Sequence, residues 1–117
     1  MSTHPVYVIS GVAGSGKTTL AHAWAPTMGA AIVDLDVVAA NVVDTALREH
    51  PEATQWQINA AYRARRYRCL IDAITSGRRS ASVMAVAPFT QEIAGEAPWA
   101  HFVRDIGGDL SLIHISE

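Results

Sequence analysis

The chain has 117 residues, of which 50% are hydrophobic and 17% are charged, and its formal net charge is −2. This length allows one domain with a modest core. The small negative charge lacks the basic excess of proteins that bind nucleic acid or anionic membranes, so we expect neither as a partner. Cys69 is the single cysteine, which excludes an internal disulfide and favours a cytoplasmic location. The sequence contains no run of about 20 apolar residues, the length that a membrane span needs.

The chain begins with an apolar run, a glycine-rich loop and a helical pattern. Residues 5–10 (PVYVIS) form a short, β-branched run that predicts a buried strand. The loop follows at once, and residues 18–28 then carry apolar side chains at helical spacing up to Gly29, a plausible helix stop. Pro26 lies late in this segment, so we expect the helix to kink or to end near residue 25.

The rest of the chain alternates between the same two kinds of pattern. Strands are expected at 31–34 and 82–87, and helices at 37–48, 53–76 and 98–106. Strands that alternate with helices indicate a parallel sheet whose two faces are covered. The sequence therefore predicts an α/β fold with a doubly wound parallel sheet, of which about three strands are visible.

The loop GVAGSGKTT matches the phosphate-binding pattern G-x-x-x-x-G-K-[ST] from its first residue, and it lies between a predicted strand and a predicted helix. Glycines in such a loop let successive backbone N–H groups point at phosphate oxygens, and the helix that follows adds the positive end of its dipole. The residues predicted to bind the nucleotide are Gly11, Val12, Ala13, Gly14, Ser15, Gly16, Lys17, Thr18 and Thr19. Lys17 should reach the β- and γ-phosphates of ATP, and the Thr18 hydroxyl should bind Mg²⁺.

Two aspartates, Asp34 and Asp36, follow the second predicted strand. In a parallel sheet the loops at the carboxyl ends of adjacent strands share one crevice, so we expect these carboxylates to face the glycine loop. Asp36 is a candidate catalytic base, with a helix N-cap as the alternative role, since an apolar helix is expected directly after it. Asp34 is a candidate for holding Mg²⁺, directly or through water.

The third predicted strand ends in Ala87-Pro88-Phe89 and carries no carboxylate there. Motor-like and chaperone-like ATPases of this class end that strand with acidic residues that hold Mg²⁺ and activate water. This chain instead has an acid where an acceptor hydroxyl would lie. The pattern favours phosphoryl transfer to a substrate over hydrolysis that is coupled to mechanical work.

The stretches GVAGSGKTTLA, VDLD and APF together resemble the P-loop kinase superfamily, whose members are often described as AAA family ATPases. The branch that contains gluconate kinase, chloramphenicol phosphotransferase and the zeta toxins is the most similar. The resemblance covers about residues 5–106, and it implies that Asp36 is a catalytic base or a substrate anchor. Members of the branch often have an arginine a few residues later, where this chain has Ala39 and Ala40.

The resemblance also bears on the organisation of the chain. A P-loop kinase core has five parallel strands and a mobile lid with arginines, and its first strand lies between the third and the fourth. We expect residues 1–108 to be the N-terminal part of such a domain. The tail 109–117 (DLSLIHISE) has two interpretations: it begins a fourth strand, or it is non-native and derives from translated sequencing-adapter sequence, which it resembles. We favour the second, which would leave one side of the first strand uncovered and the chain inactive by itself.

The function expected from the sequence is that of an ATP- and Mg²⁺-binding protein, the N-terminal part of a phosphotransferase that moves the γ-phosphate of ATP to a small-molecule hydroxyl. Two alternatives stay open on the same fold: a nucleotide-hydrolysing regulatory ATPase, and a module that binds nucleotide without turning it over. Four arginines of the helix expected at 53–76 form a basic cluster, for which we favour a solvated surface; binding of an anionic acceptor through Arg63 or Arg66 is the alternative. The four arginines are Arg63, Arg65, Arg66 and Arg68.

Overall fold

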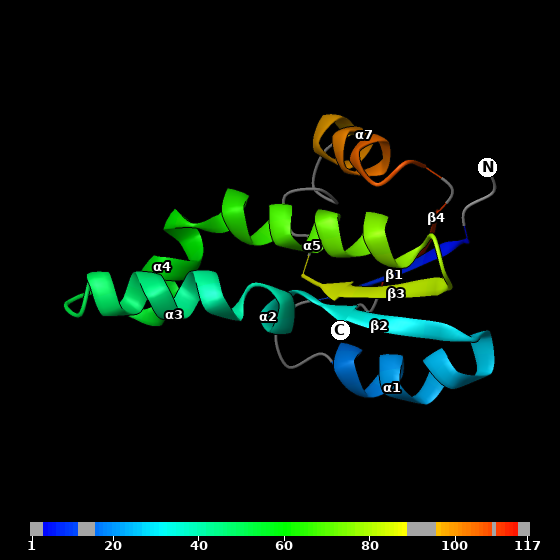
Figure 1. The fold of residues 1–117 in the computed structure, drawn as a ribbon, viewed down its shortest axis with the longest axis horizontal. Helices are drawn as coiled ribbons and strands as arrows, with labels where there is room; N and C mark the ends of the chain where they lie inside the picture. Colours follow the sequence, from blue (N-terminus) through cyan, green and yellow to red (C-terminus); the bar gives the residue numbers. More distant parts are fainter. Residues whose placement is uncertain (1–3, 12–15, 89–95, 109, 115–117) are drawn as a thin grey trace.

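The computed structural model describes residues 4–11, 16–88, 96–108 and 110–114, which form one parallel sheet with helices on both sides (Figure 1). The strands are β1 (Val6–Ser10), β2 (Ala30–Asp34), β3 (Ser82–Ala87) and β4 (Leu110–His114). The helices are α1 (Lys17–Met28), α2 (Leu35–Val38), α3 (Ala40–Glu49), α4 (Gln55–Ala61), α5 (Arg63–Gly77) and α7 (Glu96–Asp105). The α/β class with a parallel sheet, predicted from the sequence, is confirmed.

The sheet has the strand order β2-β3-β1-β4, and every neighbouring pair is parallel. The expected position of the first strand, between the third and the fourth, is confirmed. The expectation of three strands is wrong, because β4 pairs with β1 along five residues, from Val6 against Leu110 to Ser10 against His114. Residues 110–114 of the tail therefore form a strand that covers the side of β1 expected to be open. The origin of the tail and the boundary at residue 108 stay predictions.

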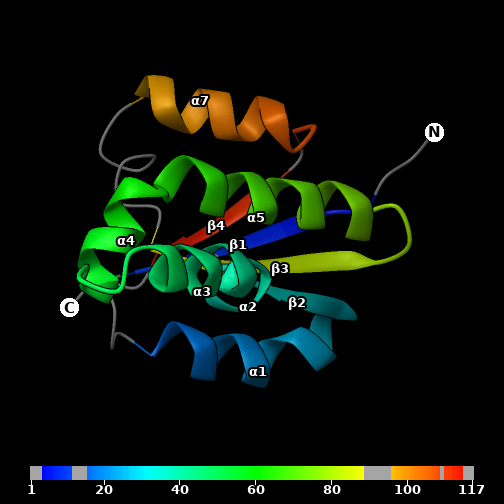
Figure 2. The same cartoon turned by 60° about the vertical axis from the view of Figure 1, so that its left-hand side comes forward.

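The two faces of the sheet pack against different helices, because successive side chains of a strand point to opposite faces (Figure 2). On one face Val6, Val8, Val83 and Ala85 join the main core with residues of α5 and α7. The residues that α5 and α7 add to this core are Tyr67, Leu70, Ile71, Ile74 and Phe102, and Ile106 directly after α7 joins them. On the other face Ile9, Met84 and Val86 pack against Ala21 and Ala25 of α1. The central strands β1 and β3 are thus apolar on both faces, as the continuous hydrophobic runs in the sequence indicated.

Helix α1 continues through Pro26 to Met28, so the expected end near residue 25 is wrong. Proline lacks an N–H group, so its position in the last turn removes one hydrogen bond, to the carbonyl of residue 22. Gly29 closes the helix in the left-handed conformation (φ 62°), and its N–H donates to the carbonyls of Ala25 and Pro26. A proline this close to the C-terminus therefore leaves the rest of the helix intact.

Two expected helices are each divided in the structure. The helix expected at 37–48 begins two residues earlier as α2, breaks at Ala39 and continues as α3. The helix expected at 53–76 breaks at Tyr62 into α4 and α5. Neither break occurs at a glycine or proline, so the local sequence carried no signal for it. Helices α3 and α4 extend beyond the sheet next to the carboxyl ends of its strands (Figure 1), and we call them the helical arm (40–61).

Arg78, at the C-terminal end of α5, is almost fully buried, with 2% of its surface exposed. Its Nε donates to the carbonyl of His4 at 3.1 Å, and its Nη1 donates to the carbonyls of Ile106 and Gly108, both at 2.7 Å. His4 leads into β1, and Gly108 leads into β4. One buried side chain therefore joins the end of α5 to the segments that enter two neighbouring strands.

We predict that Arg78→Met lowers the free energy of unfolding by about 2–4 kcal/mol, because it leaves three carbonyl groups without their charged donor. The neighbouring Arg79 is exposed, so Arg79→Met is a matched control with an expected change within about 0.5 kcal/mol. Urea denaturation followed by circular dichroism measures both. Equal unfolding midpoints for the two variants would contradict this role of Arg78.

Candidate functional site

The described part of the glycine loop lies between the end of β1 and the start of α1. Gly11 follows β1 and is buried, and Gly16 is the N-cap of α1. Gly16 has a φ of 87°, a left-handed conformation that is strained for residues with a Cβ atom. Glycine at this position therefore lets the chain turn sharply into the helix. The predicted nucleotide-binding residues 12–15 lie outside the described residues.

Lys17 and Thr18 are the first two residues of α1, and Thr19 follows them. The first turn of α1 contains no acidic residue, so its N–H groups and the positive end of the helix dipole meet no internal carboxylate there. Lys17 is also the single lysine of the chain. This helix start, at the carboxyl end of β1, has the features of an anion-binding position.

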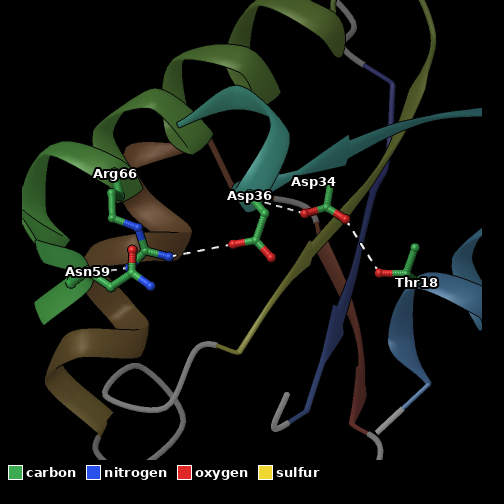
Figure 3. Close-up of polar contacts among 5 residues, drawn as sticks. All are labelled: Thr18, Asp34, Asp36, Asn59 and Arg66. Atoms are coloured by element: carbon green, nitrogen blue, oxygen red, sulfur yellow. Dashed lines mark hydrogen bonds and ion pairs between the residues drawn. The ribbon is translucent and has the colours of Figure 1, made fainter. Parts of the chain in front are cut away.

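Asp34, the last residue of β2, has two polar contacts (Figure 3). Its Oδ1 accepts a hydrogen bond from the backbone N–H of Asp36 at 2.9 Å, so Asp34 is the N-cap of α2. Its Oδ2 accepts a hydrogen bond from the Thr18 hydroxyl at 3.5 Å. The structure thus brings the two candidate Mg²⁺ ligands, Thr18 and Asp34, next to each other although they are 16 residues apart in the sequence.

The alternative role expected for Asp36, that of a helix N-cap, is wrong. The cap of the helix after β2 is Asp34, and Asp36 lies in the first turn of α2. The side chain of Asp36 is 88% exposed, so its carboxylate is available to solvent or to a ligand. The helix begins at Leu35, two residues earlier than the apolar pattern indicated, so its N-cap is residue 34 and not residue 36.

Arg66 of α5 faces Asp36 (Figure 3). Its Nη2 lies 3.7 Å from Oδ1 of Asp36, and its Nη1 donates to the backbone carbonyl of Asn59 at 3.3 Å. The Arg66 side chain is only 11% exposed. An ion pair with one exposed partner adds about 0–1 kcal/mol of stability, so the contact orients the two groups more than it stabilises the fold.

These groups surround one cavity of about 460 Å³. Lys17, Thr18 and Asp34 line it on the side of the glycine loop, and Asp36 lies among its lining residues as well. The helical arm and α5 provide the opposite side with the polar residues Asp44, Gln55, Asn59 and Arg66. The ends of β2 and β3 thus open into a space that is shared by the residues predicted to bind phosphate and a second set of polar side chains.

The carboxyl end of β3 contributes Val86, Ala87 and Pro88 to this cavity. None of these three described residues has a carboxylate. The acids that line the cavity, Asp34, Asp36 and Asp44, come from β2, α2 and α3. The observed arrangement therefore matches the acid distribution expected from the sequence. Phe89, the last residue of the APF stretch, lies outside the described residues.

Three polar residues of the cavity were not found by the sequence analysis: Asp44, Gln55 and Asn59. Asp44 lies on α3, whereas Gln55 and Asn59 lie one turn apart on α4, so only the packing of the helical arm brings all three together. Of the four arginines of α5, Arg66 alone lines this cavity. Arg63 and Arg65 lie over the rings of Tyr67 and Tyr62, at 4.1 and 5.6 Å from the ring centroids.

No helix in the described ranges has the length and apolar character that crossing a membrane requires. Comparison with curated proteins gave no match. Among solved structures, a protein from Chloroflexus aurantiacus J-10-fl described as a "putative kinase" is similar, with a TM-score of 0.63 and 15% sequence identity. The alignment covers 98% of this chain and 60% of that protein, so this chain spans well under two thirds of its length.

A comparison with protein-family models adds a match of the sequence itself. The model of a family described as AAA domain matches residues 6–116, nearly the whole chain. The chain therefore belongs to this AAA domain family, and it shares the fold of the solved structure.

Proposed function

We propose that the protein binds ATP with Mg²⁺ and transfers the γ-phosphoryl group to a hydroxyl of a small molecule. The observation that carries this proposal is the shared cavity of about 460 Å³. Lys17 and Thr18 line it together with the exposed carboxylate of Asp36. A purely nucleotide-binding loop needs no such second polar wall. The space beside the phosphate-binding residues is large enough for part of an acceptor molecule.

The residues beside the loop fit a magnesium ion. Mg²⁺ prefers oxygen ligands and is usually held by one or two protein groups, with waters and substrate phosphates completing its coordination. The Thr18 hydroxyl and the Asp34 carboxylate are such groups, and their oxygens lie 3.5 Å apart. When bound, the ion would neutralise negative charge on the phosphates, and in this proposal Thr18 and Asp34 hold it directly or through water.

In the proposed reaction, the acceptor oxygen forms a bond to the γ-phosphorus while the bond between that phosphorus and the β–γ bridging oxygen breaks. The electron pair of the broken bond leaves with ADP. The proton of the acceptor hydroxyl passes to Asp36, whose carboxylate is free of a capping role and exposed to the cavity. Lys17 and the N-terminus of α1 hold the phosphates, and Arg66 orients Asp36.

We predict that Lys17→Ala weakens ATP binding about 10- to 100-fold, because a hydrogen bond to a charged group is worth about 1.5–3 kcal/mol. Isothermal titration calorimetry with ATP and Mg²⁺ measures the change. Arg79→Ala removes one positive charge at an exposed position outside the cavity and serves as the control. Equal nucleotide affinity for wild type and Lys17→Ala would contradict the proposed role of the loop.

For Asp36→Asn we predict nearly unchanged ATP binding and a loss of about 10²- to 10⁴-fold in acceptor-dependent ADP formation, the usual contribution of a general base. ADP formation is followed with a panel of small hydroxyl compounds. Asp72→Asn is the control, since Asp72 is an exposed acid that contacts Arg68 on α5 and does not line the cavity.

The same assay separates the proposed transferase from its alternatives. ADP formation that is independent of every acceptor would favour a regulatory ATPase. Tight ATP binding without any turnover would favour a binding module. A full rate of transfer in Asp36→Asn would leave the mechanism without its base.

A further inference from the structure

The cavity has two cationic side chains among its described lining residues, Lys17 and Arg66. Lys17 lies at the start of α1, on the side proposed to hold the phosphates of ATP. Arg66 is therefore the one lining cation on the side of the helical arm, where an acceptor would bind. This arginine can bind an acidic acceptor only if its guanidinium group is not already occupied by contacts within the protein.

The guanidinium of Arg66 is engaged by the protein on two sides. Nη1 donates to the Asn59 carbonyl at 3.3 Å, and Nη2 faces the Asp36 carboxylate at 3.7 Å. With 11% of the side chain exposed, little of the group is open to a further anion. An anionic acceptor would have to compete with Asp36 for the guanidinium, and it would displace the contact that orients the proposed base.

The acidic side chains on the same side of the cavity outnumber this cation. Asp36 and Asp44 both line the cavity, and both are exposed. Asp44 has no ion pair with any residue in the described part of the chain, so its charge is uncompensated there. Among the described lining residues of the acceptor side, two carboxylates accompany one guanidinium, so negative charge predominates there. Gln55 and Asn59 add neutral amide groups that can donate to and accept from hydroxyls.

We infer that the acceptor is an uncharged or cationic small molecule with several hydroxyl or amino groups, and that anionic acceptors are disfavoured. This inference rests on the proposed phosphotransferase function and specifies its substrate class. Asp44 acts as a specificity-determining residue by attracting positive charge and accepting hydrogen bonds. Gln55 and Asn59 bind hydroxyls, while Arg66 serves Asp36 and not the substrate.

Three polyhydroxylated compounds of similar size test the charge preference: protonated glucosamine, glucose and gluconate. Their binding is measured by ligand-observed NMR titration of the 117-residue protein loaded with Mg²⁺ and a non-hydrolysable ATP analogue. We expect glucosamine to bind most tightly and gluconate most weakly, with about a threefold to fivefold step for each unit of charge, since one charge pair at 4 Å in water is worth about 1 kcal/mol.

Variants on α3 show whether Asp44 sets the preference. Asp44→Asn should reduce the ratio between the affinities for glucosamine and gluconate about threefold or more. Glu49→Gln removes the same charge from the same helix outside this cavity, and it should leave the ratio unchanged. Tighter binding of gluconate than of glucosamine would overturn the inference, as would a ratio unaffected by Asp44→Asn or no binding of glucosamine at about 20 mM.

The outcomes for the inference and for the proposed function are separate. The expected order of binding without transfer to any sugar or other hydroxyl compound would support the charge preference and contradict the phosphotransferase. Transfer to anionic acceptors only would support the phosphotransferase and contradict the charge preference.

Discussion

The site depends on the parallel pairing of β3 between β1 and β2. The register aligns Ser10 with Ala87 and Asp34 with Val86, so the three strands end almost level with one another. Since all of them run in the same direction, their carboxyl ends meet at one edge of the sheet. The glycine loop leaves from the end of β1 and the acidic segment from the end of β2, so the pairing through β3 places both beside the same cavity.

The position of Asp34 at the end of β2 determines how the neighbouring acid is used. Its side chain caps α2, and the same carboxylate accepts a hydrogen bond from Thr18. The short helix α2 begins at Leu35, and Asp36 lines the cavity from the first turn of this helix. One aspartate thus caps the helix and contacts Thr18, while the carboxylate of the second is exposed beside the cavity. Two acids separated by a single residue can take these different roles only because the helix starts between them.

The helical arm provides the wall of the cavity that faces the phosphate-binding residues. It reaches this position because the chain breaks at Ala39 and again at Tyr62. At the second break Arg66 donates to the carbonyl of Asn59 at the end of α4, which ties the arm to α5. The same side chain also faces Asp36. The orientation of the proposed base and the position of the arm are therefore coupled through Arg66.

A second arginine, which is buried, has a different role at the other end of the sheet. Arg78 lies near the amino ends of the strands, is almost inaccessible, and donates to backbone carbonyls that precede β1 and β4. Arg66 and Arg78 are both on or next to α5 and have similar local sequence surroundings. One helps to form a polar cavity, and the other connects loops. Their different roles follow from which end of the sheet each one reaches.

The sequence by itself determined the features that depend on short-range patterns. The glycine loop, the start of α1, the apolar strands and the acids after β2 are contiguous motifs whose geometry follows from backbone sterics and helix dipoles. It also indicated the parallel sheet, because strands and helices alternate.

Only the tertiary structure decided the breaks at Ala39 and Tyr62 and the choice of Arg66 from four arginines on one helix. It also decided that residues 110–114 pair with β1. The reason is physical: each of these features arises from contacts between segments distant in the chain. Such contacts depend on packing and on the match of hydrogen-bond partners, which no local pattern records.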